Sequence, residues 1–180
     1  MVDLAIVGRL GDDALIGGIA VGGTIFNFLY WNFSFLRMGT SGFAAQAYGA
    51  RALREAAKVL VRALGVAVAV ALAIWALQTF VVRAAMSVMD GSEAVENAAS
   101  RYFLVRIWAA PATLSLYAFT GWFIGMQNSR TPMWISIGIN IVNIACSLAA
   151  VRLFGMGIEG VALGTVIAQW SGVAMGPLGI

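Results

Sequence analysis

Four polar residues inside a hydrophobic stretch could bind a cation or a polar substrate. Residues 130–147 are mostly apolar, yet Ser136, Asn140, Asn143 and Ser147 occur at positions i, i+4, i+7 and i+11. At about 100° per residue, these side chains form one narrow stripe along a helix. Their oxygens suit the coordination of a hard cation, and the same groups could instead join two helices through hydrogen bonds. Both roles require the stripe to face protein or a watery cavity rather than lipid.

Asp3 is the candidate for carrying charge within the membrane. The first eight residues are apolar apart from this carboxylate, and Arg9 follows them. They are too few to span a bilayer and have no basic region before them, so we interpret them as the last two turns of a helix rather than as a signal peptide. Asp3 would then lie roughly 9–15 Å from the helix end, where a carboxylate typically handles protons or cations. If the chain truly starts at Met1, Asp3 instead lies in water.

Polar residues also mark faces of three other apolar segments. Thr165 and Gln169 are one helical turn apart in the last segment, and they could serve either as a ligand pair or as a contact between helices. Asn27 and Tyr117 belong to polar faces of two earlier segments. Uncharged polar groups inside a membrane typically face the interior of a helix bundle. We therefore expect a substrate cavity lined by Asn27, Ser136, Ser147, Tyr117 and Gln169.

The composition predicts that transmembrane helices position these residues. Of the 180 residues, 61% are hydrophobic and 11% are charged, with a mean hydropathy of +0.89, whereas soluble domains average roughly 25% charged residues. Several segments reach the length of about 20 apolar residues that crosses a bilayer. Small residues spaced by four, such as Gly18/Gly22 and Gly121/Gly125, predict close helix contacts. We predict an all-α, polytopic membrane protein with helices at approximately 1–8 (partial), 14–48, 59–82, 102–126, 132–154 and 160–178.

Several classes of function lack the residues that they need. The chain has no His, and its one Cys, Cys146, lies in an apolar segment. We therefore expect no enzyme, no metal centre and no disulfide within the chain. The basic residues form no cluster typical of nucleic-acid binding, so we expect no nucleic-acid partner. The dense run Arg51–Lys58 favours a cytoplasmic position for that loop, and for both chain ends, under the positive-inside rule.

Four stretches resemble one transporter family. They are V-D-L-A-I-V-G-R-L-G at 2–11, T-I-F-N-F-L-Y-W-N-F-S-F-L-R-M-G-T-S-G-F-A-A-Q-A-Y-G at 24–49, G-W-F-I-G-M-Q-N-S-R-T-P-M at 121–133 and G-I-E-G-V-A-L-G-T-V-I-A-Q-W at 157–170. Their order and spacing are similar to those of the multidrug and toxic compound extrusion (MATE) family, most of all its DNA-damage-inducible bacterial branch. The resemblance covers essentially the whole chain. It implies the amino-terminal lobe of a twelve-helix, two-lobe transporter, with helix 1 truncated and the carboxy-terminal lobe missing.

The resemblance also implies an activity and a set of site residues. Members are cation-coupled antiporters that export organic, often cationic or amphipathic, compounds across the bacterial cytoplasmic membrane, with H⁺ or Na⁺ as the coupling ion and no other cofactor. The acidic residue of helix 1 that carries the ion matches Asp3. Polar residues of helices 5 and 6 match Asn143 and Thr165, and Asn140 lies beside them. Ser147 stands where branch members commonly have a second acid, which leaves Asp3 as the one charged group of the predicted site.

Two alternatives remain open from the sequence. A related flippase for lipids or lipid-linked precursors would share the lobe architecture, and we would expect more arginine in its cavity. The sequence pattern places the arginines of this chain at helix ends and in loops. The second alternative is an inactive, truncated membrane fragment.

Overall fold

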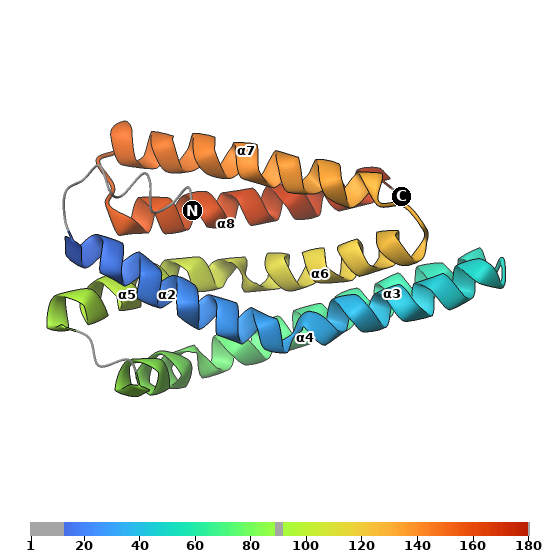
Figure 1. The fold of residues 1–180 in the computed structure, drawn as a ribbon, viewed down its shortest axis with the longest axis horizontal. Coiled ribbons are helices and arrows are strands. Elements are labelled where there is room, and N and C mark those ends of the chain that lie inside the picture. Colours follow the sequence, from blue (N-terminus) through green and yellow to red (C-terminus); the bar gives the residue numbers. More distant parts are fainter. Residues whose placement is uncertain (1–12, 89–91, 180) are drawn as a thin grey trace.

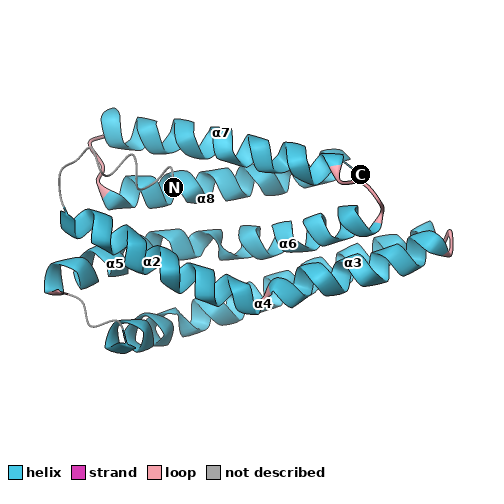
Figure 2. Ribbon diagram, in the orientation of Figure 1, coloured by secondary structure: helices cyan, strands magenta, loops and turns pink. Residues whose placement is uncertain are grey.

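The computed structural model describes residues 13–88 and 92–179 and consists of helices that run roughly along one axis (Figure 1). The segment that carries Asp3 lies outside the described residues. No strand occurs in the described part of the chain (Figure 2). The helices are α2 (Asp13–Asn32), α3 (Ser34–Gly49), α4 (Leu53–Val88), α5 (Glu93–Arg106), α6 (Ala110–Gly125), α7 (Arg130–Arg152) and α8 (Ile158–Met175), with short 3₁₀ turns at Ile107–Ala109 (η2) and Gly176–Gly179 (η3).

Five spans within the described residues are long and apolar enough to cross a membrane: Leu15–Gly49, Leu53–Ala84, Glu93–Gly125, Arg130–Arg152 and Ile158–Gly179. The most apolar window of α7 is only 17% buried inside the bundle, whereas that of the Glu93–Gly125 span is 61% buried. An apolar helix that its own bundle leaves uncovered needs lipid or another protein surface around it. The chain is therefore a multi-pass, all-helical membrane protein, as its composition predicts.

The central span begins earlier than the sequence predicts, and it is interrupted near Pro111, the residue from which a kink in this span is predicted. The helix predicted for 102–126 begins at Glu93, and it is interrupted by η2 just before Pro111. Proline lacks the N–H that would bond the carbonyl four residues earlier, which belongs to Ile107. The indole N–H of Trp75 donates to that carbonyl oxygen at 2.9 Å. The Trp75 side chain of α4 thus replaces the hydrogen bond that the Ile107 carbonyl would receive in an unbroken helix.

The first described span is also interrupted. The segment predicted as one helix over 14–48 consists of α2 and α3, which are separated at Phe33. The amide of Phe33 donates to the Tyr30 carbonyl at 3.0 Å, so a tight turn joins the two helices. The Gly-rich stretch that follows Arg37 continues α3 without a break. Neither Pro nor Gly stands at Phe33, so the break has no local sequence signal.

Glycines allow the helices to approach closely, as their spacing predicts. A Cβ at Gly18 would lie 2.6 Å from the Ala98 Cβ, and one at Gly22 would lie 2.6 Å from Cδ1 of Tyr102. These contacts hold α2 against α5. On α6, a Cβ at Gly121 would lie 2.3 Å from the Arg37 carbonyl oxygen, so α3 and α6 meet backbone to backbone.

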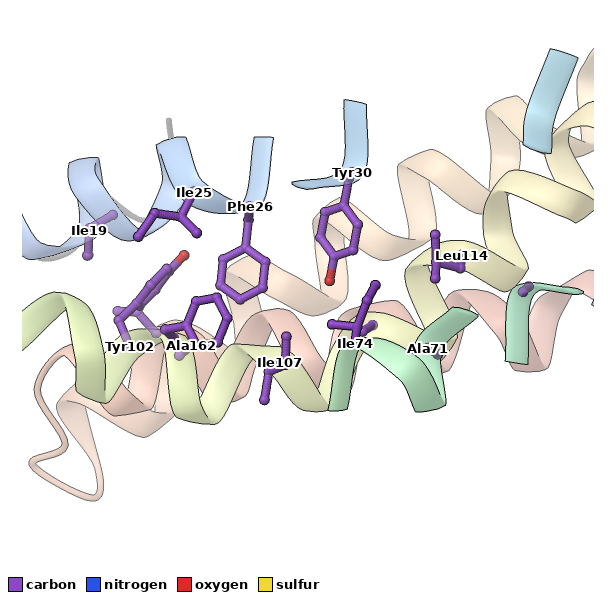
Figure 3. Close-up of a cluster of buried hydrophobic side chains, with 14 of the residues drawn as sticks. Ile19, Ile25, Phe26, Tyr30, Ala71, Ile74, Tyr102, Ile107, Leu114 and Ala162 are labelled. Atoms are coloured by element: carbon purple, nitrogen blue, oxygen red, sulfur yellow. The ribbon is translucent and has the colours of Figure 1, made fainter. Parts of the chain in front are cut away.

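A buried hydrophobic cluster fills the space between α2, α4, α5, α6 and α8, and its buried aromatic rings come from α2 and α5 (Figure 3). Phe26 stacks on Phe103 with ring centroids 4.8 Å apart and on Tyr30 at 5.6 Å. Tyr102 meets Phe26 edge to face. This cluster fixes the position of α2 relative to the break in the α5–α6 span, and that break forms part of the cavity described next.

Candidate cavity between the helix pairs

A cavity of about 790 Å³ lies where α2, α3, α5 and α6 face α7 and α8. This volume is within the range of roughly 300–1,000 Å³ that is typical of small-molecule sites. The helix α7 packs along α8 but meets α6 at only a few positions, which leaves the space open. The walls combine aromatic and aliphatic side chains with hydroxyls, amides and two arginines: Thr24, Asn27, Phe28, Tyr30, Trp31, Arg37, Arg106, Ala109, Thr113, Leu116, Tyr117, Thr120, Ile135, Ser136, Ile139, Thr165 and Gln169.

The structure brings most of the predicted cavity residues together. Asn27 comes from α2, Tyr117 from α6, Ser136 from α7 and Gln169 from α8, and all four line the same cavity. Thr165, predicted for the ion site, lines it as well. Because these residues are up to 142 positions apart in the chain, only the packing of the helices could collect them. The cavity therefore offers several uncharged hydrogen-bonding groups to one ligand.

Ser147 does not line this cavity, contrary to the sequence prediction. Its side chain is 0% exposed and donates to Oδ1 of Asn143 at 3.3 Å. The helix α8 covers it, because a Cβ at Gly164 would lie 2.2 Å from the Ser147 hydroxyl oxygen. The polar stripe of α7 thus faces the cavity at Ser136 and becomes a contact between helices at Ser147.

Asn143 joins α7 to α8. Its amide nitrogen donates to the Thr165 hydroxyl oxygen at 3.1 Å, and its amide oxygen accepts from Ser147. Asn140 differs, since it is exposed and its amide donates to the Ser136 carbonyl of the same helix at 2.8 Å. Asn140 is not part of the cavity wall. Of the two roles left open for the stripe, this geometry favours helix association for Asn143 and Ser147.

We expect Asn143→Ala to lower the free energy of unfolding by about 0.6 kcal/mol, and by no more than roughly 1.7 kcal/mol, as for other hydrogen bonds between membrane helices. The measurement is unfolding in detergent. Asn140→Ala is the matched control and should change stability by less, because its bond is made within one helix. Equal losses for the two variants would contradict the assignment of Asn143 to the α7–α8 contact.

Two arginines, Arg37 and Arg106, line the cavity although they stand at helix ends, as the sequence pattern predicts. These helix ends adjoin breaks inside long spans, a position in the bundle that the sequence did not reveal. Arg37 lies twelve positions before the Leu15–Gly49 span ends. Arg106 lies thirteen positions after α5 begins at Glu93, or about 20 Å at 1.5 Å per residue. The acidic first turn at Glu93 and Glu96 is a helix-start signal that could have revealed this position.

Arg106 is held in place by aromatic groups. Its guanidinium carbon lies 5.0 Å from the Phe26 ring centroid and 5.3 Å from that of Tyr102. One guanidinium N–H donates to the Tyr102 hydroxyl oxygen. Within residues 13–88 and 92–179, the ion pairs are Lys58–Glu55 and Arg101–Glu159, so Arg106 has no carboxylate partner there. Two aromatic rings and a hydroxyl orient the guanidinium, and no acid of the described chain neutralises its charge.

The described residues offer little to a metal ion. They contain no group of three or more His, Cys, Asp or Glu side chains that could hold one. Cys146 is a free thiol of intermediate exposure on α7. No acidic side chain lines the cavity in the described ranges, so its walls present hydroxyls, amides, rings and two guanidinium groups.

Comparison with known proteins identifies relatives along the whole chain. The MatE family model matches residues 1–149. DNA damage-inducible protein F of Escherichia coli (strain K12) is 38% identical over 178 residues, which cover 99% of this chain and 39% of that protein. Four curated relatives that match along most of this chain are covered by it over 35–39% of their length.

Solved transporters share the fold of the chain. A crystal structure of MATE in the bent conformation superposes with a TM-score of 0.88 at 20% identity, over 97% of this chain and 39% of that one. The lipid II flippase MurJ in an inward closed conformation superposes with a TM-score of 0.73 at 16% identity, over 99% of this chain and 40% of that one. At these identities the likeness shows the fold alone, namely that of one lobe of a larger helical transporter.

Proposed function

The chain belongs to the MatE family, whose members are membrane transporters and not enzymes, and from this premise we propose that it forms the amino-terminal lobe of a cation-coupled antiporter. Its substrates are organic, amphipathic compounds, and the membrane is the cytoplasmic membrane of a bacterium. The observation that carries the proposal is the cavity between the helix pairs. It has the volume of a small-molecule site and walls that mix rings with hydrogen-bonding groups.

The ion-coupling step is assigned to the segment that precedes α2. Asp3 binds H⁺ or Na⁺, because a carboxylate within the membrane changes charge when it takes up a proton or a cation. Thr165 contributes an oxygen at the cavity wall, and Asn143 holds that threonine in place through its 3.1 Å hydrogen bond. Asn140 is the weakest member of the predicted set, since its amide is directed to its own helix.

A second helical lobe is part of this proposal. The chain spans 39% of DNA damage-inducible protein F and a similar share of the solved transporters that it matches. A substrate cavity between two lobes can open to each side of the membrane in turn, whereas a single lobe leaves one wall of the path uncovered. The carboxy-terminal lobe is therefore a required partner for transport, together with the lipid bilayer.

The function is tested by efflux of a fluorescent amphipathic dye from cells that produce the full-length transporter. Ion-coupled antiport predicts that dye retention falls relative to cells with an empty vector, and that an ionophore for the coupling ion restores retention. Dye retention that is equal with and without the transporter, for a panel of cationic and anionic dyes, would show that it does not export such compounds. Efflux that continues after both the H⁺ and the Na⁺ gradients are dissipated would exclude ion coupling.

A lipid or lipid-linked precursor flippase is the second candidate. One observation favours it, because Arg37 and Arg106 line the cavity and arginine in the cavity is the feature expected of such a flippase. Proteoliposomes with a fluorescent phospholipid in the inner leaflet separate the two functions. Rapid transfer of that lipid, with no export of soluble dyes, would replace antiport by lipid translocation.

A further inference from the structure

We propose that the cavity takes an amphipathic organic anion, whose carboxylate, sulfonate or phosphate group is bound by Arg106 at the break between α5 and α6. This inference rests on the proposed transport function, since it names the substrate class of the same cavity. It departs from the cationic compounds that the sequence resemblance implies.

The charge of the described cavity walls favours an anionic ligand. Two guanidinium groups, those of Arg37 and Arg106, line the cavity, and no acidic side chain of the described residues does so. A cavity with low-dielectric walls and charge of one sign attracts ligands of the opposite sign. A cationic substrate would meet repulsion from these groups along the described walls.

Neighbouring aromatic groups orient the Arg106 guanidinium so that it can bind an anion. The Phe26 and Tyr102 rings and the Tyr102 hydroxyl hold its guanidinium in a defined orientation. A guanidinium has five N–H donors in a planar fork, which bind carboxylate or phosphate oxygens in pairs. One donor bonds Tyr102, and the side chain remains partly exposed at the cavity wall. An intramembrane arginine without an acidic partner among the described residues is costly unless a ligand uses its charge.

The remaining walls fit the apolar part of such a ligand. Trp31 and Phe28 are 74% and 72% exposed, although both are large and apolar. They line the same cavity as Leu116 and Ile135. A ligand with a flat or aliphatic body can cover these side chains while its anionic group bonds Arg106. This combination selects an amphiphile over a small inorganic anion.

Arg37 provides a second cationic position along the cavity. The backbone of Arg37 contacts Gly121, which lies fifteen positions beyond Arg106, or about 22 Å along the α5–α6 span at 1.5 Å per residue. The two arginines therefore lie at different depths in the bundle. An anionic group that leaves Arg106 meets Arg37 next on a path toward the end of α3 at Gly49.

Binding of three dansyl probes to the purified full-length protein in nanodiscs tests the inference. Dansylglycine is an anion, dansylglycinamide is neutral and dansylcadaverine is a cation, while the fluorophore is the same in all three. Energy transfer from protein tryptophans reports binding, because Trp31 lies on the cavity wall. We expect dansylglycine to bind about tenfold more tightly than dansylcadaverine, as befits a charge-assisted, bidentate hydrogen bond.

The variants locate the charge that makes this difference. Arg106→Gln should remove the preference for dansylglycine, and Arg106→Lys should retain part of it. Arg37→Gln should weaken the binding of dansylglycine by a few-fold, as the loss of a single more distant charge. Arg152→Gln is the control, because Arg152 is exposed at the end of α7 and is no part of the cavity wall. If Arg106→Gln does not fold, the preference for dansylglycine over dansylcadaverine in Arg106→Lys and in the wild-type protein still tests the inference.

The outcomes separate this inference from the proposed function. Equal or tighter binding of dansylcadaverine to the wild-type protein, or an unchanged preference in a folded Arg106→Gln variant, overturns it. Competition by phosphatidylglycerol in the nanodisc would assign the anionic group to a lipid, and its absence would assign it to a soluble compound. The binding assay needs no ion gradient, so a preserved preference in a protein that fails to transport would leave this inference standing and remove only the antiport proposal.

Discussion

Asp3→Asn is expected to abolish ion-driven transport in the full-length protein. Asparagine has nearly the shape of aspartate, but it cannot take up a proton and carries no charge for Na⁺. The described cavity walls contain no carboxylate that could replace it, and Ser147 stands where a second acid would be expected. We therefore expect no gradient-driven transport above the level of cells without the transporter, since an intramembrane carboxylate is the group that such coupling depends on. The measurement is the efflux rate of a fluorescent dye under an imposed gradient.

Two further variants make this result specific. Asp3→Glu keeps the carboxylate and should retain part of the coupling. Glu93→Gln removes an acid from the exposed first turn of α5 and should leave the transport rate unchanged. If Asp3→Asn transports at the wild-type rate with the same dependence on the gradient, another group carries the ion, and our assignment of Asp3 is wrong.

Gly121→Ala is expected to cause the largest loss of stability among single methyl additions on α6. The added Cβ would lie 2.3 Å from the Arg37 carbonyl oxygen and 3.2 Å from its Cα, and both atoms belong to the backbone of α3. A backbone cannot rotate away as a side chain can, so the two helices must separate. Overpacking of this kind typically costs about 1–3 kcal/mol, occasionally more, and we expect the upper end here. Thermal unfolding of the purified protein is the measurement.

Gly42→Ala provides the matched control for this change. Gly42 is exposed on α3, and a Cβ there would have no neighbouring atom within 4 Å. Because alanine favours the helix by about 1 kcal/mol relative to glycine, the control should be neutral or stabilising. Equal losses of stability for Gly121→Ala and Gly42→Ala would show that the α3–α6 contact does not limit stability.

The helical fold could be predicted from the sequence because a membrane-spanning helix requires a long run of apolar residues, which is visible in the sequence. The spans at α4, α7 and α8 were predicted with their centres in place. The start of α5 was missed, since Glu93 to Arg101 is polar and lies outside the apolar run that marked the span. The break before Pro111 was foreseeable from proline geometry, whereas the one at Phe33 has no local signature.

The cavity was only partly predictable. Helical periodicity correctly assigned Ser136 and Ser147 to one face of α7, but it contains no information on what covers that face. Gly164 brings α8 onto Ser147 and hides it, whereas Ser136 lines the cavity. The two cavity arginines were missed for the related reason that their depth depends on where the Glu93–Gly125 span begins and where the Leu15–Gly49 span ends.

Transport by the purified full-length protein in proteoliposomes tests ion-coupled antiport through this cavity without other cellular transporters. An H⁺ or Na⁺ gradient is imposed, and the accumulation of dansylglycine and dansylcadaverine is followed over time. We expect at least one gradient to drive accumulation against the concentration of the probe. Accumulation should stop when that gradient is collapsed and should be absent in Asp3→Asn. Probe movement that does not depend on either gradient, or that is the same with and without the protein, would contradict ion-coupled antiport.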